Sequence, residues 1–171
     1  MTSAPDSPRL WLAGLLIIGF LFRLLAGTWM GLGYSEAYHF SGAIRPALSY
    51  FDHPPLTFWL AWLGLTVWGQ VEPLGLRLPF ILLFSGTTWL TFVLGRRLFG
   101  PWPGFYAALL LNLSAVFTWS TAFFIQPDGP LMFFWLVCLW CLIKVLFDDP
   151  GRPNLWWAGV GLSLGAALLS K

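Results

Sequence analysis

The amino-acid sequence predicts an all-α integral membrane protein: a bundle of about five transmembrane helices with one long polar loop after the first. Hydrophobic residues make up 58% of the 171 positions and charged residues only 9%, whereas a soluble domain carries about 25% charged residues. Apolar stretches long enough to cross a membrane recur along the chain. Both histidines and two of the seven acidic residues lie together between residues 34 and 60. A polar island in such a chain is where we expect chemistry.

The charge pattern argues against a nucleic-acid partner, because the net charge is only +2 and the arginines are scattered rather than gathered in a basic stripe. The two cysteines, Cys138 and Cys141, have the C-x-x-C spacing of a redox pair. They lie in the middle of an apolar run, so the sequence favours two small buried side chains over a redox site.

The first predicted span covers residues 10–30, which at 1.5 Å per residue can cross a hydrocarbon core of about 30 Å. It reads as an uncleaved signal anchor. Arg23 lies inside it, so this side chain is expected to face the bundle interior or to extend toward the membrane surface. Residues 54–69 are apolar but short, and they follow a Pro-Pro pair that suits the first turn of a helix.

The later apolar stretches complete the bundle, and the extracytoplasmic loop is assigned to residues 31–77. Gly161 and Gly165 form a G-x-x-x-G pattern that predicts close helix packing. Four further spans are predicted, at residues 78–95, 101–122, 129–147 and 155–170.

The orientation follows from the cations, which favour the cytoplasmic side. If residues 54–69 crossed the membrane, most of the cations would be placed outside. We therefore expect residues 54–69 to form an interfacial, tryptophan-anchored helix on the outer face, with Arg45 and Arg77 outside. A cytoplasmic N-terminus then leaves five cations at the cytoplasmic ends of the spans: Arg9, Arg96, Arg97, Lys144 and Arg152. The polar loop, Asp128 and Lys171 all fall on the opposite, extracytoplasmic face.

Glu36, in the run Ser35-Glu36-Ala37-Tyr38-His39, is the first candidate for chemistry. A carboxylate at a membrane surface can act as a general base. It can equally be a solvated loop residue, and the residues alone leave both interpretations open.

Asp52 and His53 precede the Pro-Pro pair. Asp52 fits the N-cap of the following helix, and it can also orient His53 or a substrate hydroxyl. Glu36, His39, Asp52 and His53 have the ligand types of a divalent-cation site, but no helical spacing such as His-x-x-x-His supports one. We therefore assign no metal ligands and no firm cofactor.

Asp128 and Lys171 lie at span ends. Asp128 precedes a helix with Pro130 in its first turn, which suits an N-cap and the helix dipole. Lys171 can bind a phosphate as a point charge, or it can simply extend to the membrane surface.

The stretch "SEAYHFSGAIRPALSYFDHPPLTFWLAWLG" resembles the first extracytoplasmic loop of the GT-C membrane glycosyltransferases related to dolichyl-phosphate-mannose protein mannosyltransferases. Bacterial members include the lipid A aminoarabinose transferases. The pattern there is Asp-Glu-Ala-Tyr-Tyr, a gap, then Tyr-Phe-Asp-His-Pro-Pro-Leu. "QPDGPLMFFW" is similar to a later Pro-Asp-x-Pro-Leu element, and "GLSLGAALLSK" to a segment ending in lysine. The most specific piece is "YFDHPPL".

The resemblance implies transfer of a sugar from a polyprenyl-phosphate carrier to a protein, lipid or glycan acceptor. Such a displacement needs a base for the acceptor hydroxyl and cations for the departing phosphate. In that scheme Glu36 and Asp52 are the catalytic candidates. The predicted substrate-binding residues are Tyr38, His39, Arg45, His53, Asp128 and Lys171.

Two departures from the family pattern qualify the scheme. Ser35 stands where the family has the first acidic residue of its Asp-Glu pair. Family members also continue through many more spans, so we expect this chain to be the N-terminal part of a longer enzyme in a bacterial inner membrane. The alternatives are a lipid-binding or transport module without catalysis, and an inactive truncated enzyme.

Overall fold

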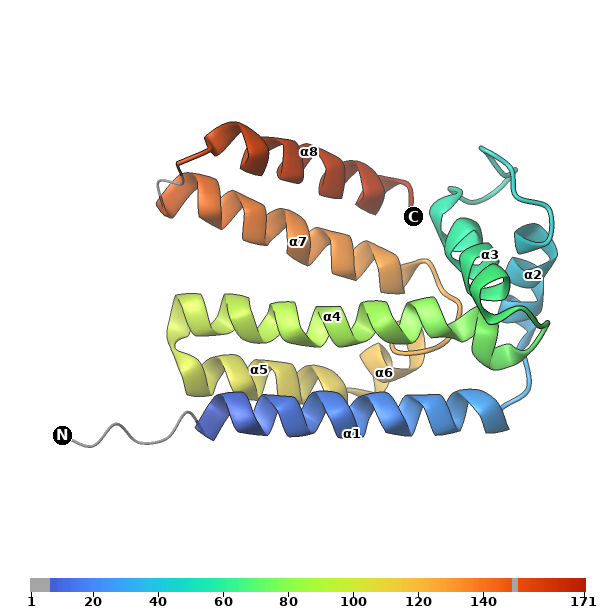
Figure 1. The fold of residues 1–171 in the computed structure, drawn as a ribbon, viewed down its shortest axis with the longest axis horizontal. Coiled ribbons are helices and arrows are strands. Elements are labelled where there is room, and N and C mark those ends of the chain that lie inside the picture. Colours follow the sequence, from blue (N-terminus) through green and yellow to red (C-terminus); the bar gives the residue numbers. More distant parts are fainter. Residues whose placement is uncertain (1–6, 149–150) are drawn as a thin grey trace.

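The computed structural model describes residues 7–148 and 151–171, and helices account for most of them. Figure 1 shows their arrangement. The helices are α1 (Ser7–Trp29), α2 (Tyr34–Ala43), α3 (Leu56–Trp68), α4 (Pro73–Phe99), α5 (Pro101–Leu113), α6 (Ala115–Thr121), α7 (Asp128–Phe147) and α8 (Pro153–Leu168).

The long helices α1, α4, α5, α7 and α8 run side by side, and α2 and α3 lie across one end of this bundle (Figure 1). Helix α4 is central, because it packs against α1, α3, α5 and α7. Within the described part of the chain, three helices are long and apolar enough to cross a membrane: Pro8–Trp29, Pro73–Phe99 and Asp128–Phe147. The predicted class, an all-α membrane bundle, is confirmed.

Glycine and proline set the ends of α4. Pro73 lies in its first turn, where a missing N–H costs nothing, and Gly100 ends it with φ 104°, a conformation that favours glycine. Near that end α4 and α5 make backbone contact: a Cβ added at Gly95 would lie 2.8 Å from the Cα of Gly104. Small residues at a membrane helix interface permit this approach.

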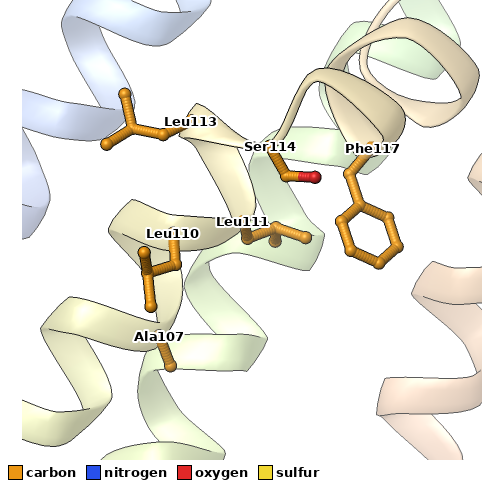
Figure 2. Close-up of a pocket in the computed structure, with 6 residues that line it drawn as sticks. All are labelled: Ala107, Leu110, Leu111, Leu113, Ser114 and Phe117. Atoms are coloured by element: carbon orange, nitrogen blue, oxygen red, sulfur yellow. The ribbon is translucent and has the colours of Figure 1, made fainter.

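The segment expected to form one helix over residues 101–122 is divided into α5 and α6. Ser114 takes an extended conformation, with ψ 118°, and ends α5. The Thr118 hydroxyl donates to the carbonyl of Asn112 at 2.9 Å, which replaces a helical hydrogen bond across the break. Figure 2 shows the junction, where Leu110, Ser114 and Phe117 border an apolar hollow of about 630 Å³.

The close packing expected through Gly161 and Gly165 is not made among the described residues: apart from the backbone of α8 itself, no heavy atom lies within 4 Å of a Cβ added at either position, and the expectation stays a prediction. Helix α8 instead approaches α7 through Gly159, where an added Cβ would lie 2.9 Å from the Cys141 Sγ. Cys138 and Cys141 are buried and free, as small apolar side chains would be.

Arg23 faces the bundle interior, with 5% of its surface exposed. Its guanidinium donates to Asn112 Oδ1 at 2.8 Å and lies 4.4 Å from the centre of the Phe84 ring. The Asn112 amide in turn donates to the Thr88 hydroxyl at 3.0 Å. A chain of polar partners across α1, α5 and α4 thus accommodates a charge that lipid would exclude.

Candidate functional site

The polar residues predicted from the sequence lie at the end of the bundle that carries α2 and α3 (Figure 1). Helix α1 ends there, α4 and α7 begin there, and α8 returns to it. The return of α8 is fixed by the Leu56 N–H, which donates to the carbonyl of Leu169 at 3.0 Å. Segments more than 100 residues apart in sequence therefore meet at this end.

At the centre of this end is a buried ion pair between Glu36 of α2 and Arg77 of α4, which are 1% and 0% exposed. The Arg77 Nε donates to Oε1 of Glu36 at 2.7 Å, and its Nη2 donates to Oε2 at 2.5 Å. This two-pronged geometry is the strongest arrangement available to a guanidinium and a carboxylate.

The same two side chains also form hydrogen bonds with the backbone groups at the ends of two helices. Arg77 also donates to the carbonyls of Gly27, Met30 and Gly31, at 3.0, 2.6 and 2.9 Å, where α1 ends. Glu36, in the first turn of α2, accepts the Gly33 N–H at 3.0 Å. A cation thus meets the negative end of one helix dipole and an anion the positive end of the next.

These contacts bear on the role of Glu36. Its Oε1 also faces the Ile125 N–H at 3.4 Å, so both oxygens have donors. A general base needs a free lone pair directed at the proton it removes. The catalytic role predicted for Glu36 stays a prediction, and its burial and partners favour a positioning role. The sequence placed Arg77 in the outer loop, next to the predicted span of residues 78–95, and did not assign it to the site. The structure places it inside α4, and the one signal in the sequence was a charge directly before an apolar run.

Asp52 and Tyr38 form an exposed pair beside this core. The Tyr38 hydroxyl donates to Asp52 Oδ1, and this hydrogen bond lowers the pKa of Asp52 below its usual value. The same bond raises the pKa of Tyr38 to about 12, so the phenol stays protonated and keeps donating. With 47% of its side chain exposed, the Asp52 carboxylate is ionised and accessible at neutral pH.

His53 lies on the other oxygen of Asp52, with 3.3 Å between Nδ1 and Oδ2. The distance is within that of an ion pair, although Nδ1 has no hydrogen-bond partner among the described residues. Asp52 therefore contacts Tyr38 and His53 through separate oxygens. The sequence left open whether Asp52 caps the following helix or orients its neighbours. Helix α3 begins at Leu56 with Pro55 as its N-cap, so Asp52 does not cap it.

His39 is buried, with 2% exposed, and its ring centre lies 5.9 Å from that of His53. Its Nδ1 lies 2.7 Å from the carbonyl of Ser35, which can only accept, so Nδ1 carries the proton. Burial lowers the pKa of His39, which keeps the ring neutral. Its Nε2 is then an acceptor with no partner in the described part of the chain.

Asp128 and Lys171 form an ion pair with 2.6 Å between Nζ and Oδ1. Asp128 opens α7 and also borders an apolar groove of about 680 Å³ between α6 and α7. Phe117 borders both this groove and the hollow at the α5–α6 junction, so the two adjoin. Lys171 is 56% exposed along its side chain. A cation thus lies at the polar end of an apolar path.

The remaining predicted residues are placed less centrally. Ser35 accepts a hydrogen bond from Gln126 at 3.1 Å, which links α2 to the segment before α7. Arg45 is exposed just after α2. Among the described residues, no group of three or more histidine, cysteine, aspartate or glutamate side chains is arranged to hold a metal ion.

Comparison with known proteins identifies the family of this chain. A family model described as dolichyl-phosphate-mannose-protein mannosyltransferase matches residues 52–171, from Asp52 through the end of the sequence. The chain belongs to this family. The mannosyltransferase family match and the relatives below relate the chain to the GT-C glycosyltransferases, as the loop motif predicted.

Three relatives extend the comparison. An uncharacterized protein of Aquifex aeolicus is 34% identical over 133 residues, 77% of this chain and 25% of the relative. The undecaprenyl phosphate-alpha-4-amino-4-deoxy-L-arabinose arabinosyl transferases 2 and 1 of Pseudomonas fluorescens are each 28% identical, over 86% of this chain and 25% and 24% of their own lengths. The chain thus spans about a quarter of the length of the curated relatives it matches. No solved structure matches it.

Proposed function

We propose that this chain forms the N-terminal part of a membrane enzyme that transfers a sugar from a polyprenyl-phosphate carrier to an acceptor at the extracytoplasmic face. One observation supports this most: an accessible, ionised carboxylate, Asp52, is held by Tyr38 of α2, the helix that carries Glu36 of the buried Glu36–Arg77 pair, at the end of an otherwise apolar bundle. The named relatives that use an undecaprenyl-phosphate sugar support the choice of donor.

In this proposal Asp52 acts on the acceptor. Its carboxylate accepts the proton of the attacking hydroxyl while that oxygen bonds to the anomeric carbon and the carrier phosphate leaves. Tyr38 holds one oxygen of Asp52. Glu36 and Arg77 fix α2 against α1 and α4, so that Tyr38 is presented at a constant position.

The carrier is assigned to the α6–α7 side. A prenyl tail is apolar and long, and it fits the groove bordered by Phe117, Met132 and Trp135. The phosphate would lie near Lys171, which at present pairs with Asp128. Arg45 and His53 are the further predicted contacts to phosphate and sugar. The acceptor, whether protein, lipid or glycan, approaches from the aqueous side.

The donor assignment is tested with the full-length protein in proteoliposomes. Undecaprenyl phosphate-α-4-amino-4-deoxy-L-arabinose and a polyprenyl-phosphate mannose are supplied separately, and release of the free polyprenyl phosphate is followed by chromatography. We expect release from at least one donor, and only with protein present. No release from either donor, with a lipid A or protein acceptor supplied, contradicts the proposal.

The membrane face is tested separately. Ser41 lies on the exposed side of α2, and a cysteine placed there should react with an impermeant thiol reagent added to intact cells. Labelling only after the cells are opened would place the site on the cytoplasmic side instead.

A further inference from the structure

The opposite end of the bundle carries a second polar pocket, far from α2 and α3. Helices α4 and α7 end there (Figure 1), and a pocket of about 350 Å³ is bordered by the C-terminal part of α4 and by Trp140 of α7. Its lining combines charge with apolar surface: Val93, Arg96, Arg97 and Trp140. Nothing in the proposed sugar transfer uses these residues.

The cations at this end exceed their carboxylate partners. Arg97 and Lys144 share Asp148, at 2.5 and 2.8 Å. Arg96 is exposed and forms no ion pair with any residue that the structure describes. The negative ends of the α4 and α7 dipoles, about half a charge each, oppose an anion here. Among the described groups, three cations against one carboxylate still leave a positive balance at this end.

The apolar part of the lining indicates what kind of anion fits. Val93 lies one turn before Arg96 and Arg97 on α4, toward the membrane interior. Trp140 forms the α7 side, and the Lys144 Nζ lies 5.0 Å from the centre of one of its rings. Tryptophan is typical of the membrane boundary, where one side of the ring meets lipid and the other meets water. A free phosphate would contact only the two arginines of the lining, whereas a phospholipid contacts the arginines through its phosphate and the apolar residues through its acyl chains.

We propose that this pocket binds the headgroup phosphate of an anionic phospholipid such as phosphatidylglycerol. The guanidinium of Arg96 donates to the phosphate oxygens, and Arg97 contributes from its contact with Asp148. The acyl chains pass Val93 and Trp140 into the bilayer. Arginine suits this role because its planar fork matches phosphate oxygens, and basic pockets between membrane helices are known sites for anionic lipids.

The test is native mass spectrometry of the full-length protein, stripped of lipid in detergent and then given equal amounts of phosphatidylglycerol or phosphatidylcholine. We expect selective retention of phosphatidylglycerol. Arg96→Gln should weaken it about fivefold, the effect of one surface cation on an anionic lipid. Arg152→Gln is the matched control, because Arg152 lies just before α8 at the same end and does not line the pocket.

Two further arms make each outcome decisive. Trp140→Leu keeps every charge and should also weaken retention. Glycerol phosphate, the soluble part of the headgroup, should not compete at equal concentration. Equal retention of phosphatidylglycerol and phosphatidylcholine overturns the proposal, and so does an equal loss of phosphatidylglycerol in Arg96→Gln and Arg152→Gln. Unchanged retention of phosphatidylglycerol in Trp140→Leu, or full competition from glycerol phosphate, overturns it as well. Circular dichroism of each variant confirms that it is folded, and a misfolded Arg96→Gln is replaced by Arg96→Lys, for which partial loss is expected.

Discussion

Arg77→Met tests whether the Glu36–Arg77 pair holds the end of the bundle together. Methionine is about as long as the arginine stem but donates no hydrogen bond, so the variant leaves the Glu36 carboxylate, 1% exposed, without its counterion. Removing one partner of a buried pair costs about 3–5 kcal/mol. The variant also lacks the hydrogen bonds from Arg77 to the three carbonyls at the end of α1. We therefore expect a loss of unfolding free energy in the upper part of this range.

The assay is denaturant unfolding of the full-length protein in detergent, followed by circular dichroism. Glu36→Gln combined with Arg77→Met removes the buried charge, so the double variant should be less destabilised than the sum of the two single variants. Arg45→Met removes an exposed arginine at the same end and should change the free energy of unfolding by less than about 0.5 kcal/mol. Strict additivity, or an effect of Arg77→Met as small as that of Arg45→Met, refutes the reasoning.

Three further predictions concern other groups. Tyr38→Phe removes the hydrogen bond that lowers the pKa of Asp52, so the acidic limb of the pH–rate profile should move to higher pH; an unmoved limb contradicts this assignment. Burial lowers the pKa of His39, so the folded state binds its proton less readily than the unfolded state, and stability should fall as pH drops below about 6.5. His39→Gln should reduce that fall in melting temperature, and an equal fall in both proteins would argue against it. Asn112→Leu removes the hydrogen-bond acceptor of Arg23 and should lower the free energy of unfolding in detergent by about 2 kcal/mol. A loss under about 0.5 kcal/mol would mean that Asn112 does not stabilise the buried Arg23 guanidinium.

The sequence predicted the helices better than it predicted their partners. Composition and hydropathy were enough for the membrane class and for the long helices, because about 20 apolar residues have few other stable forms in a membrane. The break at Ser114 was missed because neither glycine nor proline marks it; the side chain of Thr118 stabilises it instead. The Gly161–Gly165 pattern did not predict the contact between α8 and α7, which is made at Gly159, because the pattern does not say which face of α8 meets α7.

For the candidate site, the sequence likewise predicted which residues are involved but not which residues they contact. The motifs identified Glu36, Asp52 and Asp128 as special, and the structure brings them to one end of the bundle. Their contacts depend on pairings across 41 residues for Glu36 and Arg77, and across 43 for Asp128 and Lys171. Periodicity and composition carry no information on such pairings. Arg77 was therefore placed on the correct end without its role being recognised.

The activity of Asp52→Asn tests the central claim most directly. Asparagine keeps the shape of the side chain and an oxygen for the Tyr38 hydroxyl, but it cannot take up a proton as the ionised carboxylate does. Sugar transfer by the full-length protein is measured as turnover in proteoliposomes, with Asp148→Asn at the far end of α7 as the control. The account predicts that Asp52→Asn lowers kcat by about 10²–10⁴-fold with folding intact, while Asp148→Asn leaves kcat within about threefold. Turnover of Asp52→Asn equal to that of Asp148→Asn would contradict it.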